Sequence, residues 1–465
     1  MPNHDLPSRA RTWFRSLPKL KAPWSAIACA AFLIVGLDGI DRTGRWRDST
    51  LLAWDSETYY HYLPAVFIQH DLLHLAYVPA LDSTLHANFF PNDYGIYTSE
   101  LTGNRYIKYT YGTALFELPF FLLAHAYCHM PGVKDVPNGY SSTYQHAVAL
   151  SSLFFVFLGL LVLRRLLLRY CSDRATAIAL LTLSLGTNLF FYAAVASGMS
   201  HPYLFFLVGA VLYLTDRWHA RPTMRTALLL GGSIGLIALT RPVDALIVLI
   251  PLLWDLFPGD RRRAKWAAVR SHWRHLLGAT ACAILPMVPQ MIYWKVTTGH
   301  WVFYSYKDEG FDFSQPHILE GLFSFRKGWF VYSPLVMLGF LGIHLQLRTP
   351  RTFGQALPLA IYFPIFWWLV FSWYQWWYGG SFGCRPLVGS LALLALPIAH
   401  LADALRRKHA VLCDLLIVLV GLGICLNFFQ QRQYALDIIH WEEMTAERYW
   451  EVLGVGSAEG LTPFP

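Results

Sequence analysis

Hydrophobic residues in this chain gather in long blocks and do not alternate with polar residues as they do in amphipathic helices or strands. Blocks of this length are typical of membrane proteins, and they must be helical because lipid offers the backbone no hydrogen-bond partner. The pattern therefore predicts an all-α polytopic membrane protein. The blocks cover residues 25–40, 111–129, 145–163, 175–196, 202–215, 226–240, 242–257, 276–296, 329–346, 356–372, 386–402 and 410–430.

The composition agrees with this class, since 55% of the 465 residues are hydrophobic and only 14% are charged. A membrane span needs about 20 residues, and several blocks fall short of that length. We expect about 11 to 13 transmembrane helices. They form a core over residues 25–430, between a cytosolic N-terminus (1–24) and an interfacial or extracytoplasmic tail (431–465).

Basic residues predict the orientation of the chain. Five of them precede the first block without a small-residue cleavage pattern, which indicates a start-transfer helix and a cytosolic N-terminus: Arg9, Arg11, Arg15, Lys19 and Lys21. Further basic clusters lie within 164–174, 217–225, 259–275, 348–351 and 406–408, and the positive-inside rule places them in the cytosol. The net charge of +8 then reflects topology, and no nucleic-acid partner is needed to explain it.

One region conflicts with this orientation. If the blocks 25–40 and 111–129 both cross the membrane, the basic cluster at 164–174 emerges on the wrong side. Glu117 and Pro119 interrupt the second block, so 111–129 is either re-entrant or accompanied by a further crossing between 58 and 80. Both alternatives stay open at this stage.

Conspicuous polar residues fall on the predicted extracytoplasmic side, which includes the loops 41–110 and 298–328. They are Asp55, Glu57, Lys108, His201, Arg241, Lys307, Asp308, Arg326, Lys327 and Arg385. Each cation alone can be explained by snorkelling to lipid headgroups, and Arg241 can also pair with Asp244 three residues on. Together they lie on the face that the positive-inside rule depletes of cations, which points to an anionic ligand such as phosphate.

The acid Asp55 has two interpretations. It precedes a short helical run, and Asp is a preferred N-cap residue. A carboxylate near the outer membrane surface also suits a general base that takes a proton from an incoming nucleophile. Glu57, only two residues on, points to another side of the same helix.

Histidines and aromatic residues add weaker signals. His70 and His74 lie one helical turn apart, but nothing else completes a metal-ligand set, so we predict an amphipathic juxtamembrane helix there. The aromatic run over 373–378 is either a membrane-interface belt or a stacking wall for a sugar ring.

Six motifs in order resemble the bacterial GT-C superfamily of glycosyltransferases, which includes protein O-mannosyltransferases and lipid A aminoarabinose transferases. The motifs read WDSETYYHYLPAVFIQHD, KYTYGTALFELPFFLLAH, SHPYLFF, LTRPVDAL, GLFSFRKGWFVYSP and WWYGGSFGCRPL. The resemblance covers nearly the whole chain. It implies a GT-C type helical bundle with extracytoplasmic juxtamembrane helices in the bacterial cytoplasmic (inner) membrane. It also implies an active site on the extracytoplasmic face and a sugar donor carried on polyprenyl phosphate, transferred with inversion.

The resemblance also implies roles for individual residues. Asp55 matches the catalytic acid of the first extracytoplasmic loop, whereas many members have two adjacent acids there, so the role of Glu57 stays open. The donor phosphate is assigned to Lys108, His201, Arg241, Arg326, Lys327 and Arg385. Contacts with the substrate are assigned to Tyr59, Tyr109, Tyr332 and Trp376.

The implied chemistry needs few partners. Phosphate is a reasonable leaving group, so no second carboxylic acid has to protonate it, unlike in glycoside hydrolysis. Side chains can neutralise a monophosphate, and we predict no cofactor and no essential metal. The expected partners are membrane lipids, the lipid-linked donor and a hydroxyl acceptor on a glycan, lipid or protein.

Two other functions fit parts of the pattern. A transporter or flippase for lipid-linked sugars also needs cations and aromatic residues, but it predicts charges near the bilayer midplane and paired broken helices. An oligosaccharide polymerase or ligase acts on similar carriers with a diphosphate-linked donor. The early-loop Asp55 is the main reason to prefer the monosaccharide transferase.

Overall fold

The computed structural model describes residues 23–79, 94–257 and 259–457, and the basic residues before Pro23 lie outside this range. Every hydrophobic block predicted from the sequence is mainly helical, although non-helical residues interrupt 175–196 and 329–346. The long helices are α2 (Pro23–Thr43), α6 (Gly112–Cys128), α7 (Ser142–Leu167), α8 (Asp173–Leu185), α9 (Ser200–Ala220), α10 (Met224–Thr240), α13 (Trp273–Ile284), α14 (Met287–Thr298), α17 (Met337–Leu347), α18 (Phe353–Phe371), α19 (Ala395–Lys408) and α20 (Ala410–Ala435).

Further elements, most of them shorter, connect these helices. They are α3 (Asp55–Tyr60), α4 (Tyr62–Phe67), the π turn η1 (Phe191–Val195), α11 (Leu249–Leu253), α12 (Gly259–Ser271), α15 (Ile318–Phe323), α16 (Trp329–Tyr332), α21 (Ala446–Glu451) and the 3₁₀ turns η2 (Pro242–Val248), η3 (Pro334–Val336), η4 (Arg385–Leu387) and η5 (Gly389–Leu394). A two-stranded antiparallel sheet joins β1 (Ile96–Thr98) to β2 (Arg105–Ile107), with Tyr97 opposite Tyr106.

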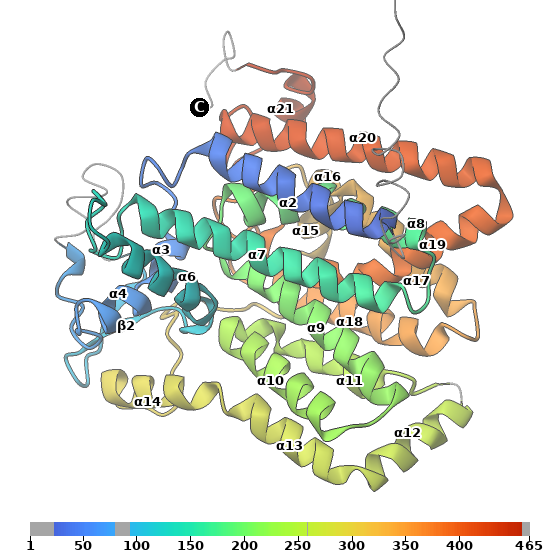
Figure 1. Ribbon diagram of the computed structural model, residues 1–465, viewed down its shortest axis with the longest axis horizontal. Coiled ribbons are helices and arrows are strands. Elements are labelled where there is room, and N and C mark those ends of the chain that lie inside the picture. The colour runs from blue at the N-terminus through green and yellow to red at the C-terminus, as the bar shows by residue number, and fades with distance from the viewer. Residues whose placement is uncertain (1–22, 80–93, 258, 458–465) are drawn as a thin grey trace, which may run out of the picture.

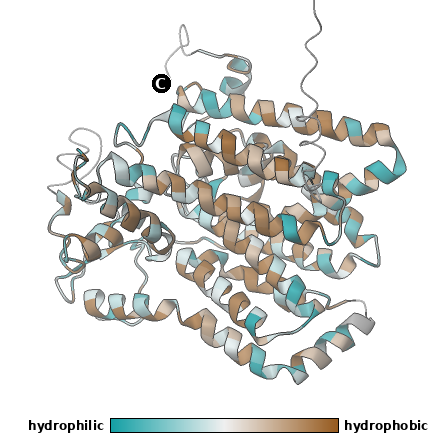
Figure 2. Ribbon diagram, viewed as in Figure 1, coloured by the Kyte–Doolittle hydropathy of each residue, from teal (hydrophilic) through white to brown (hydrophobic). Residues whose placement is uncertain are grey.

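The helices confirm an all-α polytopic membrane protein. Among the described residues, six helices are long and apolar enough to cross a membrane, and four shorter apolar helices accompany them. Figure 2 shows hydrophobic residues along the middle of α7 and α20 and hydrophilic residues towards their ends. In the stretch Trp273–Thr298 only 11% of the most apolar part is buried within the protein, which is expected where lipid tails cover the surface. The larger number of about 11 to 13 spans stays a prediction.

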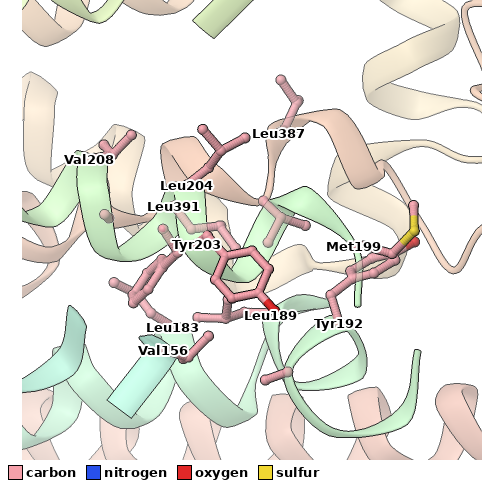
Figure 3. Packing of buried hydrophobic residues seen from close by; sticks show 14 of the residues in the cluster. Val156, Leu183, Leu189, Tyr192, Met199, Tyr203, Leu204, Val208, Leu387 and Leu391 are labelled. Carbon is pink, nitrogen blue, oxygen red and sulfur yellow. The ribbon is translucent and has the colours of Figure 1, made fainter. Parts of the chain in front are cut away.

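The core lies where α7, α8, α9 and the turn η5 meet. Figure 3 shows Val156, Leu183, Tyr203, Leu204 and Leu391 from these elements packed against one another, and all five are buried. Close packing at this junction fixes the first turns of α9, whose start lines the candidate site.

Basic clusters gather at one end of the bundle. The side chain of Arg164, at the end of α7, donates to Ser25 at the start of α2, with 2.8 Å between Nε and Oγ. The carboxylate of Asp173, which begins α8, accepts from the backbone N–H groups of Trp24 and Ser25. The end of α7 therefore lies beside the start of α2, and the helix α12, with its basic residues, lies at the same end in Figure 1.

Helix α6 explains why the charge rule and the helix count conflicted. Its aromatic contacts pair Phe116 with Phe155, Phe120 with Phe154 and His125 with Tyr144, so α6 runs antiparallel to the first half of α7. These contacts reach only as far as Phe155, about half-way along α7 towards Arg164. The C-terminal end of α6 lies beside the N-terminal end of α7. The described residues between 58 and 79 contain the short helices α3 and α4, turns, and two further helical residues, Val78 and Pro79. The position of α6 beside only the first half of α7 favours a re-entrant 111–129 over a further crossing between 58 and 80, and the topology of this segment stays a prediction.

Helices α10 and α13 pack backbone to backbone. A Cβ atom added to Gly231 or Gly235 of α10 would collide with the backbone of Ala279 or Ala283 of α13. Small residues at four-residue spacing allow this close approach, which stabilises helix pairs in membranes through van der Waals contact.

We expect Gly235→Val to destabilise the protein, because the branched side chain forces the two backbones apart. Overpacking of this kind costs about 1–3 kcal/mol. The matched control is Gly232→Val, since a Cβ atom at Gly232 meets nothing within 4 Å. Thermal unfolding of both variants in detergent measures the effect, and equal midpoints for the two would contradict the close packing.

Candidate active site

A polar cavity of about 340 Å³ opens at the end of the bundle where α3 and β2 lie in Figure 1. Its walls come from α3, the β1–β2 hairpin, the start of α9, the end of α10 and three later segments. The acidic, basic and histidine residues that line it are Asp55, Lys108, His201, Arg241, Glu309 and Arg385. Aromatic side chains complete the wall, and they are Tyr59, Tyr94, Tyr97, Tyr109, Tyr306, Trp373, Tyr374 and Tyr378.

Three side chains hold the carboxylate of Asp55, which is only 7% exposed. The hydroxyl groups of Tyr109 and Tyr94 donate to Oδ1 at 2.7 and 2.9 Å. A guanidinium nitrogen of Arg385 lies 2.8 Å from Oδ2. The ring of Tyr59 stacks on that of Tyr109, with 4.3 Å between the centroids, and holds this phenol in place.

Local structure brings these groups together. Thr58 of α3 donates to the carbonyl of Tyr94, and Gly95 lies so close that a Cβ atom there would be 2.6 Å from the Thr58 side chain. Gly95 also has a positive φ of 73°, which favours glycine. The hairpin therefore packs tightly on α3, and its two flanking tyrosines reach Asp55.

Trp54, directly before Asp55, has φ 55° and ψ −124°, a conformation that is costly for a bulky residue. Its ring contacts Tyr94 edge-on, with 5.0 Å between the centroids. The unusual backbone turns the chain sharply into α3, so that Asp55 faces the cavity at the first position of the helix.

Arg385 follows a loop, residues 379–384, that Lys327 stabilises through hydrogen bonds on the side away from the cavity. The ammonium of Lys327 donates to the carbonyl of Trp441 at 2.5 Å and to that of Ser381. Gly383, with φ 61°, passes so close to Tyr332 that a Cβ atom would lie 3.0 Å from it. These contacts fix the turn before Arg385, and burial together with the nearby cation Arg385 lowers the pKa of Lys327 to about 7.

The other two cations of the cavity also have carboxylate partners. The ammonium of Lys108 lies 2.6 Å from Oε1 of Glu309 and also faces the ring of Tyr306. Arg241 lies 3.4 Å from Asp244, as the three-residue spacing predicted, and donates to the carbonyl of Pro386 at 2.9 Å. Glu309 lines the cavity, whereas Asp244 is buried behind it.

His201 is an exception to this pattern of satisfied groups. It is 5% exposed and lines the cavity beside Arg241 and Arg385. Its Nδ1 is buried and has no hydrogen-bond partner among the residues that the structure describes. A buried polar atom without a partner is costly, so a bound ligand would find a ready hydrogen-bonding group here.

Electrostatics keep Asp55 ionised. Burial alone would raise the pKa of its carboxyl, but Arg385 and the hydroxyl groups of Tyr109 and Tyr94 outweigh burial and hold the pKa below its ordinary value. The carboxylate is therefore available as a proton acceptor, although its basicity is reduced while Arg385 is bound to it.

The structure brings together Asp55, Lys108, His201, Arg241, Arg385, Tyr59 and Tyr109 of the predicted site residues. Glu57 is buried on α3 but does not line the cavity. The remaining predicted residues lie behind or beside the loop that carries Arg385, and they are Arg326, Lys327, Tyr332 and Trp376.

The contacts of these four residues explain their placement. Arg326 stacks on Trp377 at 3.8 Å and donates to the carbonyl of Glu442, and so connects the aromatic run to the C-terminal segment. The ring of Trp376 stacks against His317 instead of facing the cavity. Tyr332 is 1% exposed and donates to the carbonyl of Phe325. Their predicted contacts with substrate have no support in this arrangement.

Two local interpretations of the sequence were wrong. Asp55 is not an N-cap, because it is the first residue of α3 and its carboxylate binds Tyr94, Tyr109 and Arg385. Residues 70–74 form turns and not a helix, because the carboxylate of Asp71 accepts from the backbone N–H groups of His74 and Ala76. Within the described residues, no group of three or more His, Cys, Asp or Glu side chains is arranged to hold a metal ion.

Sequence reasoning missed Tyr94 and Glu309. In the loop 298–328 it singled out Lys307 and Asp308, which are exposed, whereas their neighbour Glu309 lines the cavity. Lys307 has a positive φ of 53°, which marks a sharp turn of the backbone. After this turn, Glu309 lines the cavity while Lys307 and Asp308 stay exposed. Neither a hydrophobic block nor a motif marks such a turn in advance.

Comparisons with known proteins give no name to this site. No protein-family model, curated protein or solved structure matches the chain.

Proposed function

We propose that this protein is an inverting glycosyltransferase that moves a sugar from a polyprenyl-phosphate carrier to a hydroxyl acceptor, with Asp55 as the general base. The observation that carries the proposal is one cavity that combines an ionised carboxylate with Lys108, Arg241 and Arg385. Its volume of about 340 Å³ is within the range of small-molecule sites, roughly 300–1,000 Å³. The motif order that resembles the GT-C superfamily points to the same chemistry.

The reaction can be written with the residues of the cavity. The acceptor hydroxyl gives its proton to Asp55, and its oxygen forms a bond to the anomeric carbon. The bond between that carbon and the phosphate oxygen breaks, and its electron pair leaves with the phosphate. Arg385, Arg241 and Lys108 stabilise the charge that develops on the leaving phosphate, while the tyrosine and tryptophan rings offer apolar faces to the sugar.

The location of the cavity supports a transferase more than a transporter. Its cations come from the residue after β2, the end of α10 and the turn η4, at one end of the helices, whereas transporters bind substrate near the bilayer midplane. The basic clusters lie at the opposite end, so the positive-inside rule favours an extracytoplasmic active site in the inner membrane.

A transfer assay tests this function directly. Purified protein in detergent is incubated, in separate reactions, with synthetic polyprenyl-phosphate monosaccharides or with polyprenyl-diphosphate sugars, and with a membrane extract as acceptor. The released polyprenyl phosphate or diphosphate is measured by mass spectrometry. We expect release from at least one donor of this class. Release only from diphosphate-linked donors would identify the polymerase or ligase alternative instead, and no release from any donor would refute the proposal.

A further inference from the structure

Two carboxylates occupy the positions on the cavity cations where a phosphate oxygen would bind. Oδ2 of Asp55 is 2.8 Å from Arg385, and Oε1 of Glu309 is 2.6 Å from Lys108. Both distances are those of charge-assisted hydrogen bonds, and both pairs are largely buried. The cavity is therefore not an open anion site, because an incoming anion has to compete for these cations.

Competition between Asp55 and phosphate for Arg385 affects the chemistry directly, because Asp55 is the proposed base. One guanidinium cannot keep a close bond to Asp55 and also present its paired N–H groups to a phosphate in the same direction. Arg241 differs, because its carboxylate partner Asp244 lies behind the cavity wall and leaves the cavity side of the guanidinium available.

We propose that donor phosphate displaces Asp55 from Arg385 and Glu309 from Lys108, and that this exchange makes Asp55 a competent base only once the donor is bound. The inference rests on the proposed function for the identity of the donor. It adds an order of events, in which donor binding precedes activation of Asp55. It also adds a residue, Glu309, that positions Lys108 and takes no part in the proton transfer.

The exchange follows from the groups around Asp55. While Arg385 is bound, three donors hold the carboxylate and reduce its affinity for a proton. After the exchange, the two tyrosine hydroxyls still orient Oδ1, and Oδ2 is free to accept the proton of the acceptor hydroxyl. Activation of the acceptor before the donor arrives is thereby prevented.

The proposal predicts that removing a competing carboxylate tightens phosphate binding. In Asp55→Asn and Glu309→Gln, the cation is released without a change in side-chain size, and we expect farnesyl phosphate to bind about tenfold more tightly, a change that corresponds to about 1.4 kcal/mol. A role of Asp55 and Glu309 in holding the binding site together predicts the opposite, weaker binding.

Binding of farnesyl phosphate to the purified full chain in detergent is measured by tryptophan fluorescence. The charge-matched control is Asp312→Asn, which removes one negative charge from the same segment as Glu309 but is exposed and does not line the cavity. Farnesol, which lacks the phosphate, controls for the prenyl chain and should bind equally to all variants.

Tighter phosphate binding by Asp55→Asn and Glu309→Gln, with Asp312→Asn unchanged, supports the exchange. Unchanged or weaker binding in both variants, or equal tightening in Asp312→Asn, overturns it. If Asp55→Asn fails to fold, as thermal unfolding reports, Glu309→Gln decides alone. Since no turnover is measured, the exchange can stand while the transfer assay fails, and it can fail while transfer succeeds.

Discussion

Asp55→Asn is expected to lower the rate of transfer by about 10²–10⁴-fold, the contribution that a positioned general base typically makes. The amide keeps the size of the side chain but cannot accept a proton from the acceptor hydroxyl. The rate is measured as polyprenyl phosphate released from the donor identified in the transfer assay, with donor above saturation so that tighter binding cannot hide the loss.

The matched control for this variant is Glu57→Gln, on the same short helix. Glu57 does not line the cavity, and we expect its replacement to leave the rate within a few-fold of the wild type. Full activity in Asp55→Asn would refute the assignment of the base. Equal losses in the two variants would restore the alternative in which both acids take part.

Arg385→Ala is expected to cost about 10²–10³-fold in transfer, since it removes a preorganised cation from the leaving phosphate. It also leaves Asp55 as a buried carboxylate without its cation, a loss that typically destabilises a protein by about 3–5 kcal/mol. The two effects separate in Arg385→Lys, which keeps the charge and most of the stability but lacks the paired N–H groups.

Turnover and thermal unfolding are measured together for these variants. Arg326→Ala is the control, because Arg326 stacks on Trp377 outside the cavity, and it should retain donor turnover. A loss of turnover in Arg326→Ala as large as that in Arg385→Ala would place the phosphate elsewhere, in the cluster around Trp377.

The sequence predicted the fold class because long hydrophobic blocks leave the backbone few alternatives in lipid. It did not predict where helices break inside a block. The block 175–196 ends as an α-helix at Leu185, and Asn427 of α20 donates to the freed carbonyls of Leu185 and Thr187 at 2.8 and 2.9 Å. That partner is more than 200 residues away, so no local pattern indicates the break.

The sequence predicted several of the residues that belong to the candidate site, but it did not predict which of them contact one another. Cations on the face that should lack them pointed to Lys108, Arg241 and Arg385. Their carboxylate partners could not be inferred, apart from Asp244, because ion pairs between distant segments depend on how the helices pack.

The pairing of distant segments has a consequence for biosynthesis. Lys108 and Glu309 are 201 residues apart in the chain. At about 5–20 residues per second, the ribosome needs roughly 10–40 s between these two residues, and Arg385 follows later still. Throughout that interval Lys108 lacks its carboxylate partner and Asp55 lacks its cation, so a chain truncated before Glu309 leaves both charges uncompensated. We expect such a fragment to be degraded faster than the full chain, because a buried charge without its partner destabilises the fold.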